Sequence, residues 1–237
     1  MPRHCKIHDV AQRSIEWQRL RAGLLTGSCA GDSVSQPNER SKKSPELGDT
    51  VKETDKRRSL RYKLAAERIC GLSFDQPFST RWTEDGVLWE PLAIAEFERL
   101  TDSCVFTAGL LTHNTLKAGF SPDGYVDDFA EIVETKCFDW KNHVDSLRAD
   151  TLDADIQAQV FHGMWLTGAK RGHVVFFNPK FPAPLRTRIV TLDVKDKETK
   201  QALGIYAGRA ELFLEDVEKT VAHLLALGQP KETEGAA

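Results

Sequence analysis

Two neighbouring stretches decide the fold: Ser121-Pro122-Asp123-Gly124-Tyr125-Val126 and Glu131-Ile132-Val133-Glu134-Thr135-Lys136-Cys137. The second is short, apolar and β-branched, which predicts a β-strand. Successive side chains of a strand point to opposite faces, so Glu134 and Lys136 share one face. A hairpin built on the turn-forming residues between the stretches would bring Asp123 beside Glu134. The sequence therefore predicts that two carboxylates and an ammonium group converge at one point.

This trio has the composition of a magnesium site for phosphodiester hydrolysis. Mg²⁺ binds oxygen ligands, usually one or two carboxylates together with waters and substrate phosphate. A lysine beside the site can orient the attacking water, while the metal neutralises charge on the leaving oxygen. The alternative is a solvated hairpin in which Glu134 and Lys136 form an exposed pair. Glu-x-Lys alone favours that alternative because the tripeptide is common, but Asp123 at hairpin distance favours the metal site.

At these residues the chain resembles a known family. Asp123 with Glu134-x-Lys136 resembles the core of the PD-(D/E)XK nucleases, and the fuller pattern is similar to the YqaJ-like viral recombinases typified by lambda exonuclease. Further motifs match in order: Glu16-Trp17-x-x-x-Arg21-x-Gly23-x-x-Thr26-Gly27-Ser28, Glu90, and Gln157-Ala158-Gln159-Val160 with Met164-Trp165. The resemblance covers residues 14–192, and the motifs in this order are more specific than any one alone.

The resemblance implies a deoxyribonuclease that depends on Mg²⁺, with Mn²⁺ as a substitute. It implies an exonuclease that degrades one strand of double-stranded DNA from the 5′ end and leaves a 3′ overhang for a single-strand annealing protein. It also implies a homo-oligomer, a ring-shaped trimer. Two alternatives stay open: an endonuclease of the repair or restriction type, and a DNA-binding module without catalysis. A module of the second kind would have lost a core residue, and the chain retains Asp123, Glu134 and Lys136.

The family assigns roles to individual residues of the core. The metal ligands it implies are Asp123, Glu134 and the backbone carbonyl of Thr135. Lys136 would orient the attacking water. Two further residues would support them, Glu90 on a mid-chain helix and Gln159 on a later one. For Glu90 the alternative is a surface glutamate near Arg99 or Glu96, and Gln157 is expected to be an exposed helix residue.

A second group, near the start of the chain, predicts a phosphate site. Arg21 is expected on a helix that begins near Ser14, with Thr26 and Ser28 just after its end. Hydroxyl groups and helix N-termini bind phosphate, and arginine adds a fork of donors. The family implies that Arg21, Thr26 and Ser28 bind the 5′-phosphate of DNA. The alternative is a helix cap with a surface arginine.

Composition agrees with a globular protein of one domain. The chain has 237 residues, is 41% hydrophobic and 28% charged, and carries a net charge of −3, so any DNA-binding surface must come from local placement of its 32 Lys and Arg. The five cysteines are scattered with no C-x-x-C, which argues against a zinc or iron–sulfur site. Without an expected signal peptide or membrane span, we expect a cytoplasmic, intracellular protein with no membrane partner.

The predicted class is α/β (α+β in detail), with a central mixed sheet flanked by helices. The resemblance implies a restriction-endonuclease-like core with an N-terminal helical extension. We expect a single nuclease domain over residues 1–237, with a flexible internal segment at 31–58, a C-terminal helix at 195–226 and a disordered tail at 228–237. Helices are expected at 60–72, 85–100, 140–147 and 154–167, and strands at 105–108, 116–120, 172–178 and 186–192. Ile156 and Phe161 depart from the family, which often has tyrosine and glutamine there.

Overall fold

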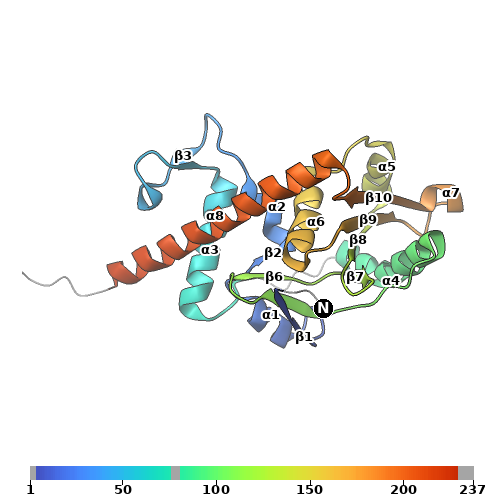
Figure 1. Ribbon diagram of the computed structural model, residues 1–237, viewed down its shortest axis with the longest axis horizontal. Coiled ribbons are helices and arrows are strands. Elements are labelled where there is room, and N and C mark those ends of the chain that lie inside the picture. Colours follow the sequence, from blue (N-terminus) through green and yellow to red (C-terminus); the bar gives the residue numbers. More distant parts are fainter. Residues whose placement is uncertain (1–3, 76–80, 229–237) are drawn as a thin grey trace, which may run out of the picture.

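The computed structural model describes residues 4–75 and 81–228 (Figure 1). Its strands are β1 (Cys5–His8), β2 (Leu25–Thr26), β3 (Lys42–Lys43), β4 (Lys52–Glu53), β5 (Leu110–His113), β6 (Ala118–Phe120), β7 (Gly124–Val126), β8 (Glu131–Cys137), β9 (Arg171–Phe177) and β10 (Thr187–Asp193). Its α-helices are α1 (Ile15–Arg21), α2 (Ala30–Val34), α3 (Asp55–Cys70), α4 (Arg81–Thr101), α5 (Trp140–Arg148), α6 (Ala154–Thr167), α7 (Ala183–Arg186) and α8 (Lys197–Leu227).

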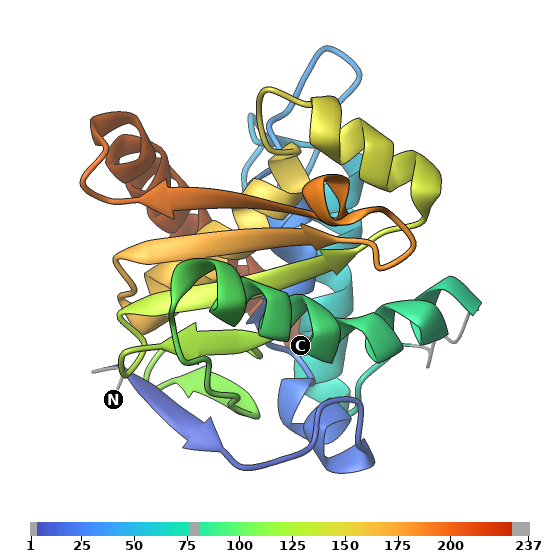
Figure 2. The same ribbon diagram turned by 90° about the vertical axis from the view of Figure 1, so that its right-hand side faces the viewer.

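A mixed four-stranded sheet in the order β10-β9-β8-β7 holds the centre. β8 and β9 run parallel, and the other two pairings are antiparallel. Helix α4 covers one face and α6 the other (Figure 2). Side chains of β8 alternate between the two faces of the sheet. Ile132 therefore packs in the core cluster on the α6 side and Val133 in the cluster on the α4 side. Burial on both faces explains why β9 is a nearly continuous apolar run.

A second four-stranded sheet, β1-β5-β6-β2, lies beside the first, and it too mixes parallel and antiparallel pairs. The predicted α/β class with a central mixed sheet between helices is therefore confirmed, and the second four-stranded sheet is a feature that the sequence did not predict. The strand expected at 105–108 is wrong. Only Phe106 pairs there, in an isolated bridge to Tyr125, and the strand itself begins at Leu110. A one-residue bridge carries no ladder for local β-propensity to reveal.

The hairpin that connects β7 and β8 has the predicted form. Its register pairs Gly124 with Val133, so one further step brings Asp123 opposite Glu134. The connecting turn contains Asp127 and Asp128, both with positive φ (48° and 54°), which aspartate tolerates better than most residues. Turn chemistry thus sets the register that brings the two carboxylates together.

The segment 31–58, predicted to be flexible, contains the short β3–β4 hairpin. Glu53 on β4 is buried against the equally buried Arg61 of α3, with Arg61 Nη2 2.6 Å from Glu53 Oε2. A buried charge is tolerated only when it is paired, so this contact anchors the hairpin to α3.

Helix α8 follows the fold's long axis and runs past α3 (Figure 1). Among the described residues, no helix has the length and apolar character needed to cross a membrane.

Candidate active site

The charged trio predicted from the sequence is brought together at the β7–β8 hairpin. Glu134 and Lys136 lie on one face of β8, with Lys136 Nζ 2.9 Å from Glu134 Oε1. Asp123 precedes β7, and its Oδ2 accepts hydrogen bonds from the backbone N–H of Thr135 (2.7 Å) and from the Thr135 hydroxyl (2.9 Å). These bonds fix one carboxylate oxygen of Asp123. Its Oδ1 accepts no hydrogen bond from the residues that the structure describes.

Gln159 reaches the same point from α6. Its Nε2 donates to Glu134 Oε1, and its Oε1 accepts from Lys136 Nζ at 2.8 Å. The amide therefore holds both charged groups of β8 in place. Gln157 lies instead at a different cavity, between α2, α6 and α8. A helix turns by about 100° per residue, so residues two apart cannot share a face.

The carboxylates of this site repel one another. Burial raises the pKa of Glu134 to about 7, and the charge of Asp123 adds to the rise. Burial also raises the pKa of Asp123 and of Glu90, which comes from α4, and Asp123 adds to the rise at Glu90. The charged form of buried carboxylates whose pKa is raised is stabilised by a cation placed between them. The acid oxygens of the site therefore fit a hard divalent cation.

Within the described parts of the chain, no three His, Cys, Asp or Glu side chains gather closely enough to hold a metal by themselves. A cation here would need waters and substrate oxygens to complete its coordination, which is how Mg²⁺ usually binds. The carbonyl of Thr135 remains a predicted ligand. The structure shows a second role for Thr135, because its N–H and its hydroxyl both donate hydrogen bonds to Asp123.

The predicted phosphate-binding residues also meet. Arg21 ends α1, and its Nη2 donates to Thr26 Oγ1 (3.1 Å) and Ser28 Oγ (3.2 Å). Gly23 makes this possible, because its φ of +71° reverses the chain and a Cβ there would lie 2.6 Å from Arg68 Cγ. No carboxylate among the described residues lies within ion-pair distance of Arg21. The guanidinium is thus left with hydroxyl partners and can accept an anion.

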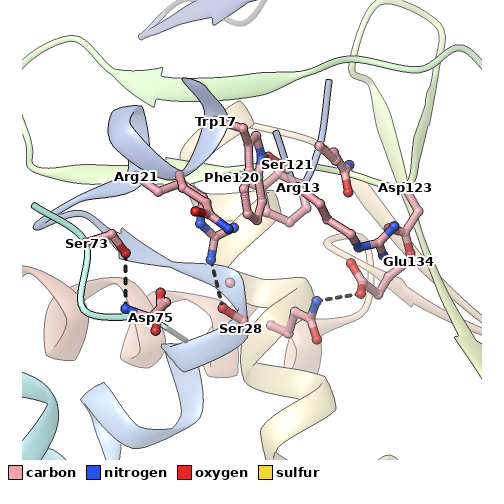
Figure 3. Close-up of a pocket in the computed structure, with 14 residues that line it drawn as sticks. Arg13, Trp17, Arg21, Ser28, Ser73, Asp75, Phe120, Ser121, Asp123 and Glu134 are labelled. Carbon is pink, nitrogen blue, oxygen red and sulfur yellow. Dashed lines mark hydrogen bonds between the residues drawn. The ribbon is translucent and has the colours of Figure 1, made fainter. Parts of the chain in front are cut away.

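One pocket of about 510 Å³ joins the two groups. Figure 3 shows Arg21 and Ser28 at one side of it and Asp123 and Glu134 at the other. Trp17 lies between them: the Arg21 guanidinium stacks over its ring at 4.0 Å. The joined pocket places an anion site next to a carboxylate site, with room for a small charged group between them.

Trp17, Ser121 and Arg13 also line this pocket, and sequence reasoning gave none of them a role. Trp17 donates from Nε1 to the hydroxyl of Ser121 at 2.8 Å, which ties α1 to the Ser-Pro-Asp-Gly turn. Trp17 and Ser121 both lie within the motifs on which the family resemblance rests, so those motifs could have pointed to them. Arg13 lies outside those motifs, and its Nη2 is 3.7 Å from Glu90 Oε2. No pattern in the sequence singled out Arg13, because only the fold brings the segment before α1 against α4.

Comparison with known proteins identifies relatives. Residues 16–170 match the model of the YqaJ-like viral recombinase domain, which confirms the resemblance seen in the sequence. No curated protein matches the chain. An alkaline exonuclease from Laribacter hongkongensis matches with a TM-score of 0.72 and 20% identity over 90% of this chain and 97% of that one. Its complex with dAMP matches with a TM-score of 0.68, at 20% identity over 91% and 100% of the two chains. A phage-related exonuclease from Haemophilus somnus 129PT matches with a TM-score of 0.61, at 15% identity over 85% and 96%.

Proposed function

Because the chain belongs to the YqaJ-like viral recombinase family, we propose that it is a Mg²⁺-dependent exonuclease that degrades double-stranded DNA from 5′ ends. The observation that carries the proposal is the single pocket shared by Arg21 and Ser28 with Asp123 and Glu134. A 5′-terminal phosphate bound at Arg21 would hold the next phosphodiester near the carboxylates. The enzyme would then release nucleotides from the 5′ end and leave a 3′ overhang.

The residues that would hold the cation are Asp123, Glu134 and, through its carbonyl, Thr135. When bound, Mg²⁺ would polarise the phosphate and neutralise charge on the leaving oxygen; Mn²⁺ could take its place. Thr135 holds one oxygen of Asp123, and the other accepts no hydrogen bond from the described residues. Lys136, positioned 2.8 Å from Gln159 Oε1, orients the water that attacks phosphorus.

The remaining carboxylate, Glu90, completes the acidic lining of the site. It lines a cavity together with Asp123, and its pKa is raised by burial and by the charge of Asp123. Gln159 contributes geometry, since it contacts Glu134 and Lys136 together. Neither group needs to exchange a proton in the reaction. The role of Gln159 is to fix the positions of Glu134 and Lys136, and that of Glu90 is to add negative charge that favours the cation.

The 5′-phosphate site consists of Arg21, Thr26 and Ser28. A guanidinium and two hydroxyls supply several donors to phosphate oxygens, the usual means by which proteins recognise a terminal phosphate. One of the similar structures is a complex with dAMP, a deoxynucleoside monophosphate of the kind that stepwise degradation of DNA releases. That ligand belongs to the other protein, and it supports a nucleotide-sized pocket in this fold.

We further propose one nuclease domain over the whole chain and a homo-oligomer, a ring-shaped trimer that passes DNA through its centre. Leu225 and Leu227 at the end of α8 are 54% and 69% exposed, and Figure 1 shows this end of α8 extending beyond the rest of the fold. Exposed apolar side chains on an extended helix favour association. The 3′ overhang would be the substrate of a single-strand annealing protein.

The experiment compares three DNAs with and without Mg²⁺: linear duplex with 5′-phosphate ends, the same duplex with 5′-hydroxyl ends, and closed circles. We expect Mg²⁺-dependent shortening of linear DNA, faster from 5′-phosphate ends, with closed circles intact. Label placed at the 5′ end should appear first in mononucleotides. Nicked circles would instead support the endonuclease alternative, and DNA binding with no cleavage would support a non-catalytic module.

A further inference from the structure

Arg13 projects a cation into the site from a segment that precedes the family match at residues 16–170. Its Nη2 lies 3.7 Å from Glu90 Oε2, and its side chain is 54% exposed. Figure 3 shows it pointing toward Asp123 and Glu134. A long, half-exposed ion pair of this kind stabilises the fold little, so the contact with Glu90 does not account for its placement.

The backbone at Arg13 is held in an unusual conformation. Its φ is +68°, a region that residues other than glycine adopt at a cost of about 1 kcal/mol or more. Arg13 is the third residue of a β-turn that the Ser14 N–H closes by donating to the carbonyl of Ala11 at 3.2 Å, and two contacts of its neighbours hold this turn in place. Gln12 Nε2 donates to the carbonyl of Pro122 at 3.2 Å, next to Asp123, and Ser14 caps α1 by accepting from the N–H of Trp17. The position of Arg13 is therefore tied to the turn that carries Asp123.

Arg13 also separates two cavities. The first, of about 510 Å³, contains Arg21, and the second, of about 540 Å³, is lined by Thr107 and Tyr125 on the other side. Both cavities are lined by Arg13 and Asp123. A DNA strand whose end is bound at Arg21 and whose next phosphate reaches Asp123 would pass within contact of the Arg13 guanidinium.

The sum of charges at the site also favours a contact between Arg13 and the substrate phosphate. Glu90, Asp123 and Glu134 contribute three negative charges when ionised, and Lys136 and Arg13 contribute two positive ones. A divalent cation and one phosphodiester then bring the assembled site to neutrality, which is the favourable condition for charges in a partly buried place. Without Arg13 the complete site would retain one negative charge against an anionic substrate.

Resting on the function proposed above, we infer that Arg13 is a further catalytic residue, whose guanidinium contacts the non-bridging oxygens of the scissile phosphate and stabilises their charge in the transition state. The exposed guanidinium exchanges its loose contact with Glu90 for the phosphate. Arginine suits this role because its planar fork can donate two hydrogen bonds to phosphate oxygens. It complements Lys136, which approaches from β8.

The test uses Arg13→Ala and Arg13→Gly in the full chain. Glycine removes the charge and also relieves the positive φ, so it separates loss of charge from disturbance of the loop. With 5′-phosphorylated linear duplex and Mg²⁺, both variants should lose kcat by roughly 10- to 100-fold, the scale of one electrostatic donor that is partly solvated. Arg13→Lys should recover part of that loss, and Arg19→Ala, an exposed arginine on α1, should match wild type.

Binding of Mn²⁺ without DNA, followed by the electron paramagnetic resonance of free Mn²⁺, supplies a readout independent of turnover. Removing a cation beside the carboxylates should leave Mn²⁺ affinity unchanged or raise it, while kcat falls. Wild-type kcat in both variants would overturn the inference. So would Mn²⁺ affinity that falls in step with kcat, since Arg13 would then only position the carboxylates. A wild-type protein that binds Mn²⁺ but cleaves no DNA would refute the proposed function, and this inference with it.

Discussion

Thr135 holds Asp123 by two hydrogen bonds to the same carboxylate oxygen, one from its backbone N–H and one from its hydroxyl. The contact joins β8 to the residue before β7. The register of the hairpin therefore determines how the carboxylate of Asp123, a predicted metal ligand, is oriented. Thr135 is the residue between Glu134 and Lys136 in the sequence, and its side chain is buried. Its side chain therefore has a role distinct from that of its carbonyl.

We expect Thr135→Val to weaken metal binding, because valine keeps the shape of threonine and the backbone N–H bond to Asp123 but lacks the hydroxyl that donates the second bond. The Mg²⁺ concentration that gives half-maximal cleavage should rise by roughly tenfold, the scale of one hydrogen bond to a charged group. Titration of the initial rate with Mg²⁺ measures this. Thr135→Ser retains the hydroxyl and should titrate close to wild type; equal titrations for valine and serine would contradict the prediction.

Asp123→Asn and Glu134→Gln remove one charge each with little change in size. Cleavage should fall by about 10²-fold or more, because each loses a ligand of the cation. DNA binding in Ca²⁺, measured by fluorescence anisotropy, should persist in wild type without turnover, since Ca²⁺ has looser geometry. Glu39→Gln, an exposed glutamate outside the pocket, is the matched control. Cleavage near the wild-type rate in both site variants would remove the metal assignment.

Lys136→Ala should lower kcat far more than it raises KM, because an oriented water matters in the transition state rather than in DNA binding. A loss on the order of 10²-fold is expected for such a group. Steady-state kinetics on linear duplex measure both constants. Lys141→Ala on α5 removes an exposed lysine outside the pocket and should leave them unchanged. A rise in KM alone would show that Lys136 is a phosphate contact.

Arg21→Ala should erase the preference for 5′-phosphate over 5′-hydroxyl ends. Arg21 lies at the far side of the pocket from Asp123, so the rate on 5′-hydroxyl DNA should change little. The ratio of the two initial rates is the measurement, and Arg19→Ala should retain the wild-type ratio. If Arg21→Ala kept the preference, the phosphate site would have to lie elsewhere.

His162 predicts a pH dependence of stability. Burial lowers its pKa from 6.5 to about 4, and the neutral ring bridges Tyr206 and the carbonyl of Gly119. The folded pKa lies below the unfolded one, so the unfolded chain binds more protons in this interval and stability falls as pH falls. Between about pH 7 and about pH 5 the loss from this group should be about 2 kcal/mol.

Urea unfolding at the two pH values measures that loss. His162→Gln keeps a donor and an acceptor but does not titrate, so its stability should fall by less than that of wild type. His223→Gln, on an exposed part of α8, is the matched control and should behave as wild type. Equal losses in wild type and His162→Gln would show that other groups carry the pH dependence.

The sequence by itself determined the local elements of the core. Alternation and turn residues predicted the hairpin that brings Asp123 beside Glu134 and Lys136, since strand period and turn chemistry act within a few residues. The 14 residues of α6 match the predicted 154–167, because Asp153 caps one end and Gly168 ends the other in a left-handed conformation. Motif order identified the family, which the comparison confirmed.

Only the tertiary structure decided which residues far apart in the sequence come into contact. The division into two sheets depends on which strands pair over long separations, and local propensity does not specify those partners. Glu53 was expected in a flexible segment, yet the buried Arg61 of α3 gives it a partner. Arg13 reaches the carboxylates of the site only because the chain before α1 packs against α4 and the Asp123 turn. Each of these contacts joins residues that no short sequence window contains, so their geometry exists only once the chain has folded.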